Sequence, residues 1–136
     1  IIVEADGGSR GNPGLAGSGA VVIDAVSGEV LAEVGRYVGV ASNNVAEYHA
    51  MIAGITKALE IFPSCELQVR MDSKLVVEQM SGRWKIKHPD MQKLANQAKA
   101  LTWGKQIIFE WIPREQNSRA DALANRAMDM QADFDH

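Results

Sequence analysis

The distribution of apolar and polar residues along the chain predicts strands first and helices later. Alternating or wholly apolar segments, bounded by glycine, proline or asparagine, predict strands at residues 1–5, 18–24, 30–38, 67–71 and 106–112. Apolar residues at helical spacing predict helices between Asn44 and Pro63, over residues 73–80, from Pro89 to Leu101, and around Leu123 to Met130. The resulting order, βββαβααβα, indicates an α/β fold with a mixed sheet and helices packed on its faces.

The length of the chain, 136 residues, indicates one domain that can bury a core without a disulfide or a structural metal. The single cysteine, Cys65, has no partner in the chain, so we expect a reducing, cytoplasmic compartment. No apolar run approaches the length of a membrane span. We expect a monomer with one domain over residues 1–130, followed at residues 131–136 by a frayed tail or the start of a linker to a further domain.

Four acidic residues occupy positions from which their side chains can meet. Asp6 and Asp72 follow predicted strands, and Glu47 and Asp121 lie in the first turns of predicted helices. In open α/β sheets, ligands bind in the crevice outside the carboxyl ends of the strands. A cluster of carboxylates without cysteine or histidine favours Mg²⁺ or Mn²⁺ over zinc. Two such ions, roughly 4 Å apart, suit an in-line displacement at a phosphodiester.

The net charge of −3 at first argues against a nucleic-acid partner, because nucleic-acid binders usually carry a basic patch. The objection weakens if the four acids are gathered in one metal site. Their charge alone exceeds the whole net negative charge of the chain, and two bound divalent cations would more than neutralise the cluster. Net charge therefore does not exclude nucleic acid.

Each acid also has a purely structural interpretation, in which it caps a helix or braces a turn. The candidate pairs are Asn44 with Glu47, Ser118 with Asp121, Asp72 with the helix after it, and Asp6 with the glycine-rich turn at residues 7–14. The first two pairs have the three-residue spacing of a capping box. Both interpretations stay open for each acid taken singly, but capping does not require the four side chains to meet.

Four short motifs resemble those of the type 1 ribonuclease H family, in the family's order and over nearly the whole chain. They are Asp6-Gly7-Gly8-Ser9 with Gly11-Asn12-Pro13-Gly14, then Ser42-Asn43-Asn44-Val45-Ala46-Glu47, then Met71-Asp72-Ser73, and finally Asn117-Ser118-Arg119-Ala120-Asp121-Ala122-Leu123-Ala124. Each motif alone is weak, but each holds one of the four acids. Together they make the resemblance specific.

The resemblance implies a ribonuclease H-like fold with a five-stranded sheet, in which three antiparallel strands precede the parallel ones. It implies a catalytic domain over residues 1–130 that hydrolyses the RNA strand of RNA–DNA hybrids as an endonuclease and leaves 5′-phosphate ends. It also implies that Asp6, Glu47, Asp72 and Asp121 hold two Mg²⁺ ions, with Mn²⁺ as a substitute.

The same resemblance assigns contacts with the substrate. The matched positions are Gly7, Asn12, Ser42, Asn43, Asn44 and Ser73. The three asparagines match residues that contact the minor groove, and amide side chains both donate and accept, as recognition of a 2′-hydroxyl requires. The two serines are candidate phosphate donors. Asparagines beside glycines and helix starts also form turns and caps, and this alternative stays open for Asn44 in particular.

The first departure from the family pattern concerns a histidine. Many members carry a catalytic histidine in a flexible loop shortly before the last aspartate, but residues 111–117 contain none. Arg114 is the candidate substitute. A guanidinium can hold a phosphate, but it does not shuttle protons near neutral pH. The alternative is a solvated arginine paired with Glu115.

The second departure concerns substrate binding. Some members carry a long basic helix and loop, whereas this chain has only the short basic connection at residues 82–88. Its Trp84 either contacts the DNA strand or packs into the core. An arginine that some relatives use to bind a DNA phosphate is also absent, where Val40 and Ala41 stand. We therefore expect weak, salt-sensitive binding. The chain resembles short bacterial and actinobacterial forms, which occur alone or fused to a phosphatase-like domain.

Two other functions remain open. One is an integrase-like or resolvase-like enzyme of the same fold that acts on DNA, and the other is a non-catalytic module that binds nucleic acid. The Asn43–Asn44 pair and the Gly-Asn-Pro-Gly turn favour hybrid cleavage over the first. Four carboxylates packed together without a metal are costly, which argues against the second. The sequence leaves open whether double-stranded RNA is also cleaved.

Overall fold

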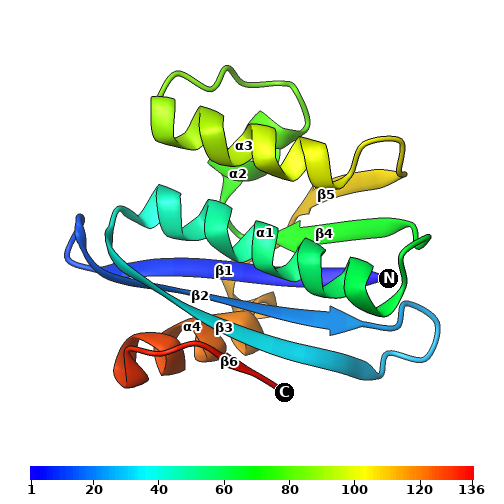
Figure 1. The fold of residues 1–136 in the computed structure, drawn as a ribbon, viewed down its shortest axis with the longest axis horizontal. Helices are drawn as coiled ribbons and strands as arrows, with labels where there is room; N and C mark the ends of the chain where they lie inside the picture. Colours follow the sequence, from blue (N-terminus) through cyan, green and yellow to red (C-terminus); the bar gives the residue numbers. More distant parts are fainter.

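A computed structural model describes residues 1–136 as one six-stranded mixed sheet with helices on both faces (Figure 1). The elements are β1 (Ile2–Arg10), β2 (Gly14–Ile23), β3 (Val30–Ala41), α1 (Asn43–Ile61), β4 (Leu67–Met71), α2 (Lys74–Met80), α3 (Pro89–Leu101), β5 (Ile107–Trp111), the 3₁₀ helix η1 (Arg114–Gln116), α4 (Ser118–Met130) and β6 (Phe134–Asp135). The strands lie in the order β5-β4-β1-β2-β3-β6. The pairs β1–β2, β2–β3 and β3–β6 are antiparallel, whereas β1–β4 and β4–β5 are parallel.

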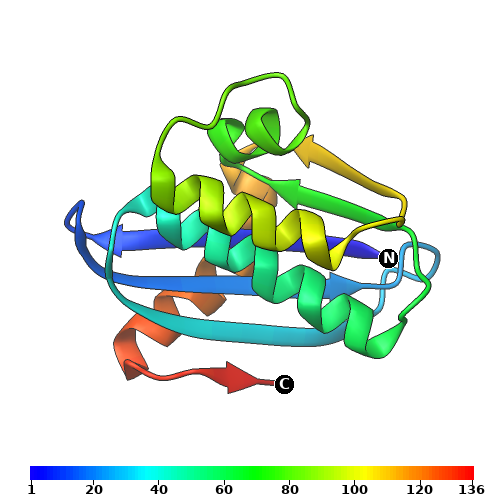
Figure 2. The ribbon, with the colours of Figure 1, turned by 45° about the horizontal axis from the view of Figure 1, so that its top comes forward.

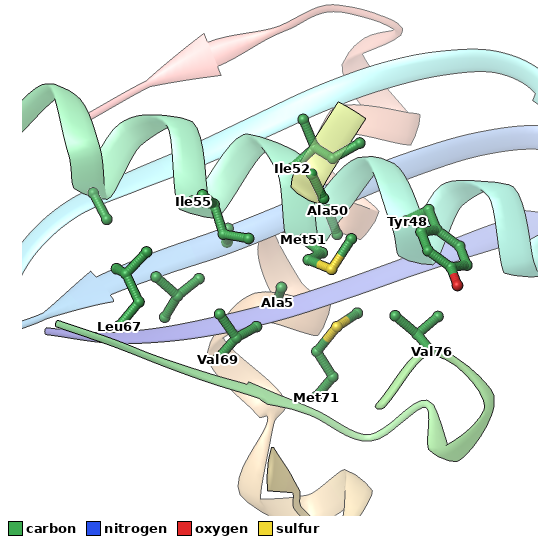
Figure 3. Packing of buried hydrophobic residues seen from close by; sticks show 14 of the residues in the cluster. Ala5, Tyr48, Ala50, Met51, Ile52, Ile55, Leu67, Val69, Met71 and Val76 are labelled. Atoms are coloured by element: carbon green, nitrogen blue, oxygen red, sulfur yellow. The ribbon is translucent and has the colours of Figure 1, made fainter. Parts of the chain in front are cut away.

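Helices α1 and α3 lie on one face of the sheet, and α4 lies on the other (Figure 2). The main core fills the space between α1 and the sheet, where Met51 and Ile55 pack against Val69 and Met71 (Figure 3). A smaller cluster under α4 contains Leu123. Side chains along a strand alternate between the two faces of the sheet. β2 contacts α1 on one face and α4 on the other, which is why it is apolar almost throughout. None of the helices is long and apolar enough to cross a lipid bilayer.

The expected α/β fold with a mixed sheet is confirmed, but the prediction of five strands is wrong by one. The tail at residues 131–136 is not frayed, because it forms β6 against the edge of β3. The ring of Phe134 lies over Gly35, where a Cβ atom would be 2.2 Å from the ring. Arg36 and Asp135 form an ion pair at 2.5 Å. These partners are about a hundred residues apart, so no local pattern in the tail predicts them.

β1 runs past its predicted end at Ala5 and continues to Arg10, because it keeps pairing with β2. Its parallel neighbour β4 pairs with it only as far as Ala5 opposite Met71. Asp6 therefore lies inside β1, and the prediction that it ends a strand is wrong. It does lie directly beside the end of β4, at a step in the sheet where Asp72 leaves the strand. This step, rather than the end of β1, determines where the site forms.

Candidate active site

Three carboxylates meet at the step beside the end of β4. Each of Asp6, Glu47 and Asp72 has a carboxylate oxygen within 4.8 Å of those of the other two. Asp6 and Glu47 are buried, and Asp72 is half-buried. They line a cleft of about 520 Å³ together with Asp121 and Arg114. Asp121 lies close enough to Asp6 to raise the pKa of that carboxyl, but it lies outside the tight group of three.

The register of the parallel strands brings Asp6 and Asp72 together. Ala5 and Met71 are partners across the β1–β4 ladder, so the residues that follow them are neighbours. Parallel strands run in the same direction about 4.8 Å apart, which places the two carboxylates side by side at one edge. Two acids far apart in the sequence therefore become adjacent through one strand pairing.

Glu47 reaches the same place because α1 passes over β1 at backbone distance. A Cβ atom at Gly7 would lie 2.2 Å from the carbonyl carbon of Ala46, so only glycine fits there. The Gly7 N–H donates to Oε2 of Glu47 at 3.1 Å, and the Ser18 hydroxyl donates to the Ala46 carbonyl at 2.6 Å. Gly7 lines the cleft, but its N–H is already used to hold Glu47.

Asp121 enters the cleft from the opposite face of the sheet. α4 packs directly on β2, where a Cβ atom at Gly19 would lie 2.4 Å from the carbonyl oxygen of Ala120. Asp121 is the next residue and lies in the first turn of α4, as predicted. Two close backbone contacts, one on each face of the sheet, thus bring helices α1 and α4 to the same group of acids.

None of the four acids caps a helix. The N-cap residues of α1, α2 and α4 are Ser42, Ser73 and Asn117. The prediction that Asn44 caps α1 is therefore wrong, because the Ser42 hydroxyl accepts the Val45 N–H at 3.2 Å instead. The carboxylate of Asp6 accepts no hydrogen bond from the glycine-rich turn, since its side-chain partners are other acids. The purely structural interpretations of the four acids are not supported.

Burial and mutual repulsion dominate the electrostatics of the cluster. Burial, followed by the charges of Glu47 and Asp72, raises the pKa of Asp6 to about 10. Burial also raises the pKa of Glu47 to about 8, against the opposing effect of the Gly7 N–H. Burial raises the pKa of Asp72 as well. Without a cation, the group holds protons at neutral pH. Its all-oxygen donors fit Mg²⁺ or Mn²⁺, which would release those protons on binding.

Asn117 is a residue of the site to which the sequence analysis gave no role. It is fully buried, and its Nδ2 donates to the Ala5 carbonyl at 2.9 Å. Its side chain also lies near Asp72 and lowers the pKa of that carboxyl, against the larger effect of burial. It is the N-cap residue of α4 yet makes no side-chain cap bond. Asn117 therefore joins β1, the end of β4 and the start of α4. Its type and position in the sequence indicate an ordinary cap, so the sequence offers no signal for this role.

The predicted minor-groove contacts lie on a rim formed by the β1–β2 turn and the start of α1. The Asn43 N–H donates to Oδ1 of Asn12 at 3.1 Å, and Oδ1 of Asn43 accepts the Ser9 N–H at 2.8 Å. Asn12, Asn43 and Asn44 are all exposed. Neither the Nδ2 group of Asn12 nor that of Asn43 donates a hydrogen bond within the protein. The side-chain oxygens of Asn12 and Asn43 therefore hold the backbone of the rim in place, while their NH₂ groups stay free to donate.

Of the remaining predicted contacts, Arg114 lines the acidic cleft and Trp84 does not. Ser42 and Ser73 accept backbone N–H groups at 3.2 and 3.3 Å, which leaves their hydroxyl hydrogens for a phosphate. Arg114 is exposed in the cleft and makes no ion pair with Glu115, and its charge lowers the pKa of Glu47 and of Asp72. Trp84 is 45% exposed, so it does not pack into the core, and it lines a separate groove.

Comparison with known proteins places this geometry in a family. A family model described as reverse transcriptase-like matches residues 4–127. The chain is 57% identical over 133 residues to the bifunctional protein Rv2228c of Mycobacterium tuberculosis, covering 97% of this chain and 36% of that protein. It is 41% identical over 128 residues to ribonuclease HI of Halobacterium salinarum, covering 91% of this chain and 62% of that protein. The chain thus spans about a third of the length of the first relative.

Solved structures agree with these sequence matches. The N-terminal RNase H domain of Rv2228c, solved as a fusion with maltose-binding protein, superposes with a TM-score of 0.89 at 58% identity, over 93% of this chain and 97% of that one. LC11-RNase H1, solved in complex with an RNA/DNA hybrid, superposes with a TM-score of 0.90 at 39% identity, over 96% and 97% of the two chains. Since the family model and the ribonuclease H structures both cover more than nine-tenths of it, this chain belongs to the ribonuclease H family.

Proposed function

We propose that the protein is an endonuclease that hydrolyses the RNA strand of RNA–DNA hybrids and leaves 5′-phosphate ends. In this proposal, Asp6, Glu47, Asp72 and Asp121 hold two Mg²⁺ ions, or Mn²⁺ in their place. The observation that carries it is the group of three carboxylate oxygens within 4.8 Å of one another in an open cleft, beside a rim of free amide donors. The complex of LC11-RNase H1 with a hybrid supports the choice of substrate.

In this proposal, the ions and the side chains have separate roles in catalysis. When bound, the ions supply Lewis acidity to the phosphodiester and to the attacking water. The carboxylates hold the ions in place, and burial keeps competing water away from their oxygens. Asn117 keeps the Ala5 carbonyl and Asp72 in register, so that the two strand ends stay aligned. Asn12, Asn43 and Asn44 face the minor groove, where a free amide donor distinguishes a 2′-hydroxyl from hydrogen.

Arg114 replaces the family's histidine with a permanent positive charge. It lies in the cleft within electrostatic reach of Glu47 and Asp72. A guanidinium is suited to hold the phosphate that forms on the product, but not to move a proton near neutral pH. Proton transfer to the departing 3′-oxygen therefore falls to solvent. The length of Rv2228c, a relative named as bifunctional, supports the further proposal that this domain works beside another in the full-length protein.

The test is cleavage of defined substrates. A labelled RNA–DNA hybrid, double-stranded RNA and double-stranded DNA would each be incubated with the protein and Mg²⁺ or Mn²⁺, with Asp72→Asn as the inactive control. We expect metal-dependent cutting of the RNA strand of the hybrid that the control lacks, with 5′-phosphates on the products. Cutting of double-stranded DNA alone would favour an integrase-like enzyme. Binding of the hybrid without any cutting by folded protein would favour the non-catalytic module.

A further inference from the structure

Trp111 presents a large aromatic surface to solvent directly beside the acidic cleft. It is the last residue of β5 and is 47% exposed. Its indole N–H donates to the carbonyl oxygen of Asp72 at 3.1 Å. The ammonium of Lys74 lies 5.9 Å from the centre of its ring. The ring is therefore held in one place by two contacts while about half of it stays open.

The fold itself does not require this arrangement. Trp111 belongs to neither hydrophobic cluster, so its ring adds nothing to the core. Trp103, in the turn before β5, is 87% exposed and makes no side-chain hydrogen bond, as expected of a tryptophan at a loop tip. Lys74 is exposed at the start of α2 and forms no ion pair within 4.0 Å. An exposed aromatic ring fixed beside an unpaired cation offers a nucleic acid both a stacking surface and a positive charge.

The strand order places Trp111 and the asparagine rim on opposite sides of the acids. Along this edge of the sheet come Trp111 at the end of β5, Asp72 at the end of β4, and Asp6 on β1, and beyond them the start of α1 with Asn43. Neighbouring strands are about 4.8 Å apart, so Trp111 lies only one strand beyond Asp72. A nucleic-acid strand that runs across the acids from the rim reaches Trp111 next.

We propose that Trp111 and Lys74 form a second contact with the RNA strand of the substrate. The indole ring stacks on the base or sugar of a nucleotide that flanks the scissile phosphate, and Lys74 binds a phosphate of that nucleotide. Stacking does not depend on base identity, so this contact aligns the strand without imposing a sequence preference. The inference rests on the proposed function and adds a substrate-binding residue to it. In this proposal Trp111 contacts the substrate directly. It is also a positioning residue, because its indole N–H holds the Asp72 carbonyl.

Steady-state cleavage of a hybrid by four variants tests the contact. Trp111→Ala is expected to raise KM about tenfold or more, with a much smaller change in kcat. Trp111→Phe keeps a ring and should recover most of the loss, although it lacks the N–H. Lys74→Gln should lower the slope of log KM against log salt by about one. Trp103→Ala is the matched control, with the same side chain removed at the far end of β5, and should leave KM unchanged.

A direct readout uses fluorescence. Trp84→Phe combined with Trp103→Phe leaves Trp111 as the one tryptophan, and Glu47→Gln in the same protein prevents cutting. Quenching on titration with hybrid is expected if the indole stacks on a base. Hybrids with a single abasic ribonucleotide at each position around the cleavage site should lose that quenching at one flanking position only.

The outcomes separate this inference from the proposed function. If wild-type protein does not cut the hybrid, the proposed function fails first. If wild-type protein cuts and Trp111→Ala has an unchanged KM, or the fluorescence does not respond, the second contact is refuted. If Trp111→Ala and Trp111→Phe both lose Mg²⁺ affinity, measured by calorimetry without substrate, the residue acts only through Asp72 and the stacking contact is also refuted.

Discussion

The acidic cleft and the basic connection at residues 82–88 are held by the fold in opposite ways. The acids lie on buried backbone that two helices approach at contact distance, with Asn117 fully buried among them. The connection is exposed except at Ile86 and is tied down mainly by side chains. Gln79 donates to the Lys85 carbonyl at 3.1 Å, Gln92 donates to the Ile86 carbonyl at 2.8 Å, and Arg83 forms an ion pair with Glu78. The geometry of the acidic cleft thus depends on packing, whereas the proposed substrate contacts of the connection depend on a few surface side chains.

This difference indicates which part of the molecule tolerates insertions, deletions and substitutions. A surface loop can gain or lose length without moving the core, because few contacts cross to it. A cleft assembled from close backbone contacts has no such freedom. The short connection is therefore compatible with an intact catalytic site. Substitutions in the cleft should change kcat and stability, whereas substitutions in the connection should change mainly KM and by less.

Removal of Asp6, a buried acid of the cluster, is the strongest way to test this comparison. Asp6→Asn should lower kcat by about 10³-fold, because it removes a ligand of the proposed ions. The same change should stabilise the metal-free protein by about 1 to 3 kcal/mol, because the Asp6 carboxyl is ionised in the unfolded chain and must take up a proton on folding, whereas an amide need not. Denaturant unfolding in chelator measures the second effect. Asp90→Asn, on the exposed first turn of α3, is the control and should leave activity unchanged.

The pKa of Asp6 gives that prediction a pH dependence. A carboxyl with a pKa of about 10 when folded and near 4 when unfolded binds more protons in the folded state between these values. The stability of metal-free wild-type protein should therefore fall as the pH rises through this window. Asp6→Asn or saturating Mg²⁺ should flatten the decline. A melting temperature of metal-free wild type that rises from about pH 5 to about pH 9 contradicts the assigned shift.

Gly7→Ala should break the cleft without touching an acid. The new Cβ would lie 2.2 Å from the Ala46 carbonyl carbon, so α1 must move away from β1 and take Glu47 with it. We expect a loss of about 3 kcal/mol in unfolding free energy and a large fall in kcat. Gly8→Ala is the matched control for stability, because its nearest new contact is the Met128 methyl at 3.8 Å. Equal stability of the two variants would rule out the close contact as a constraint.

Asn117→Ala tests whether a buried amide aligns the strand ends. It removes the buried hydrogen bond to the Ala5 carbonyl and the polar neighbour of Asp72, so we expect a loss of about 1 to 3 kcal/mol in stability. The fall in kcat should be about tenfold to a hundredfold, with weaker Mg²⁺ binding by calorimetry. A variant that is destabilised but keeps wild-type Mg²⁺ affinity and kcat would reduce Asn117 to a structural role.

The smallest effect is expected in the connection. Trp84→Ala should raise KM for a hybrid only a few-fold, because its ring lies outside the cleft on an exposed segment. The melting temperature and kcat of the Trp84→Ala variant should match those of the wild type. A fall in kcat as large as that of Asn117→Ala would show that the two regions are coupled, contrary to the comparison.

The fold could be predicted where its signals are local. β4 and α3 lie at the residues that alternation and helical spacing indicate, with Pro89 at the first position of α3. β6 could not be predicted, because two residues carry no periodicity and their partners on β3 are distant in the sequence. The extension of β1 past Ala5 was missed for a related reason, since it depends on continued pairing with β2.

The site could be predicted in its residue types but not in its geometry. Asp6, Glu47, Asp72 and Asp121 stand out by their motifs and by their predicted places beside strand ends and helix starts. The prediction that Glu47 lies in the first turn of its helix is wrong, because α1 begins at Asn43. The register that makes Ala5 the partner of Met71 is a property of the assembled sheet, and so is the tight grouping of three acids with Asp121 beside it. Asn117 has the local pattern of a cap, and only the packed structure gives it another partner.

The short strand β6 also bears on how copies of the protein meet one another. β3 is twelve residues long, and an uncovered strand of that length is a template for edge-to-edge pairing between molecules. β6 pairs with Val34 and Gly35, near the middle of β3, and so divides the open edge into shorter stretches. The tail that packs Phe134 over Gly35 therefore shortens the stretches of β3 that are open to pairing with another molecule, at the side of the sheet farthest from β5.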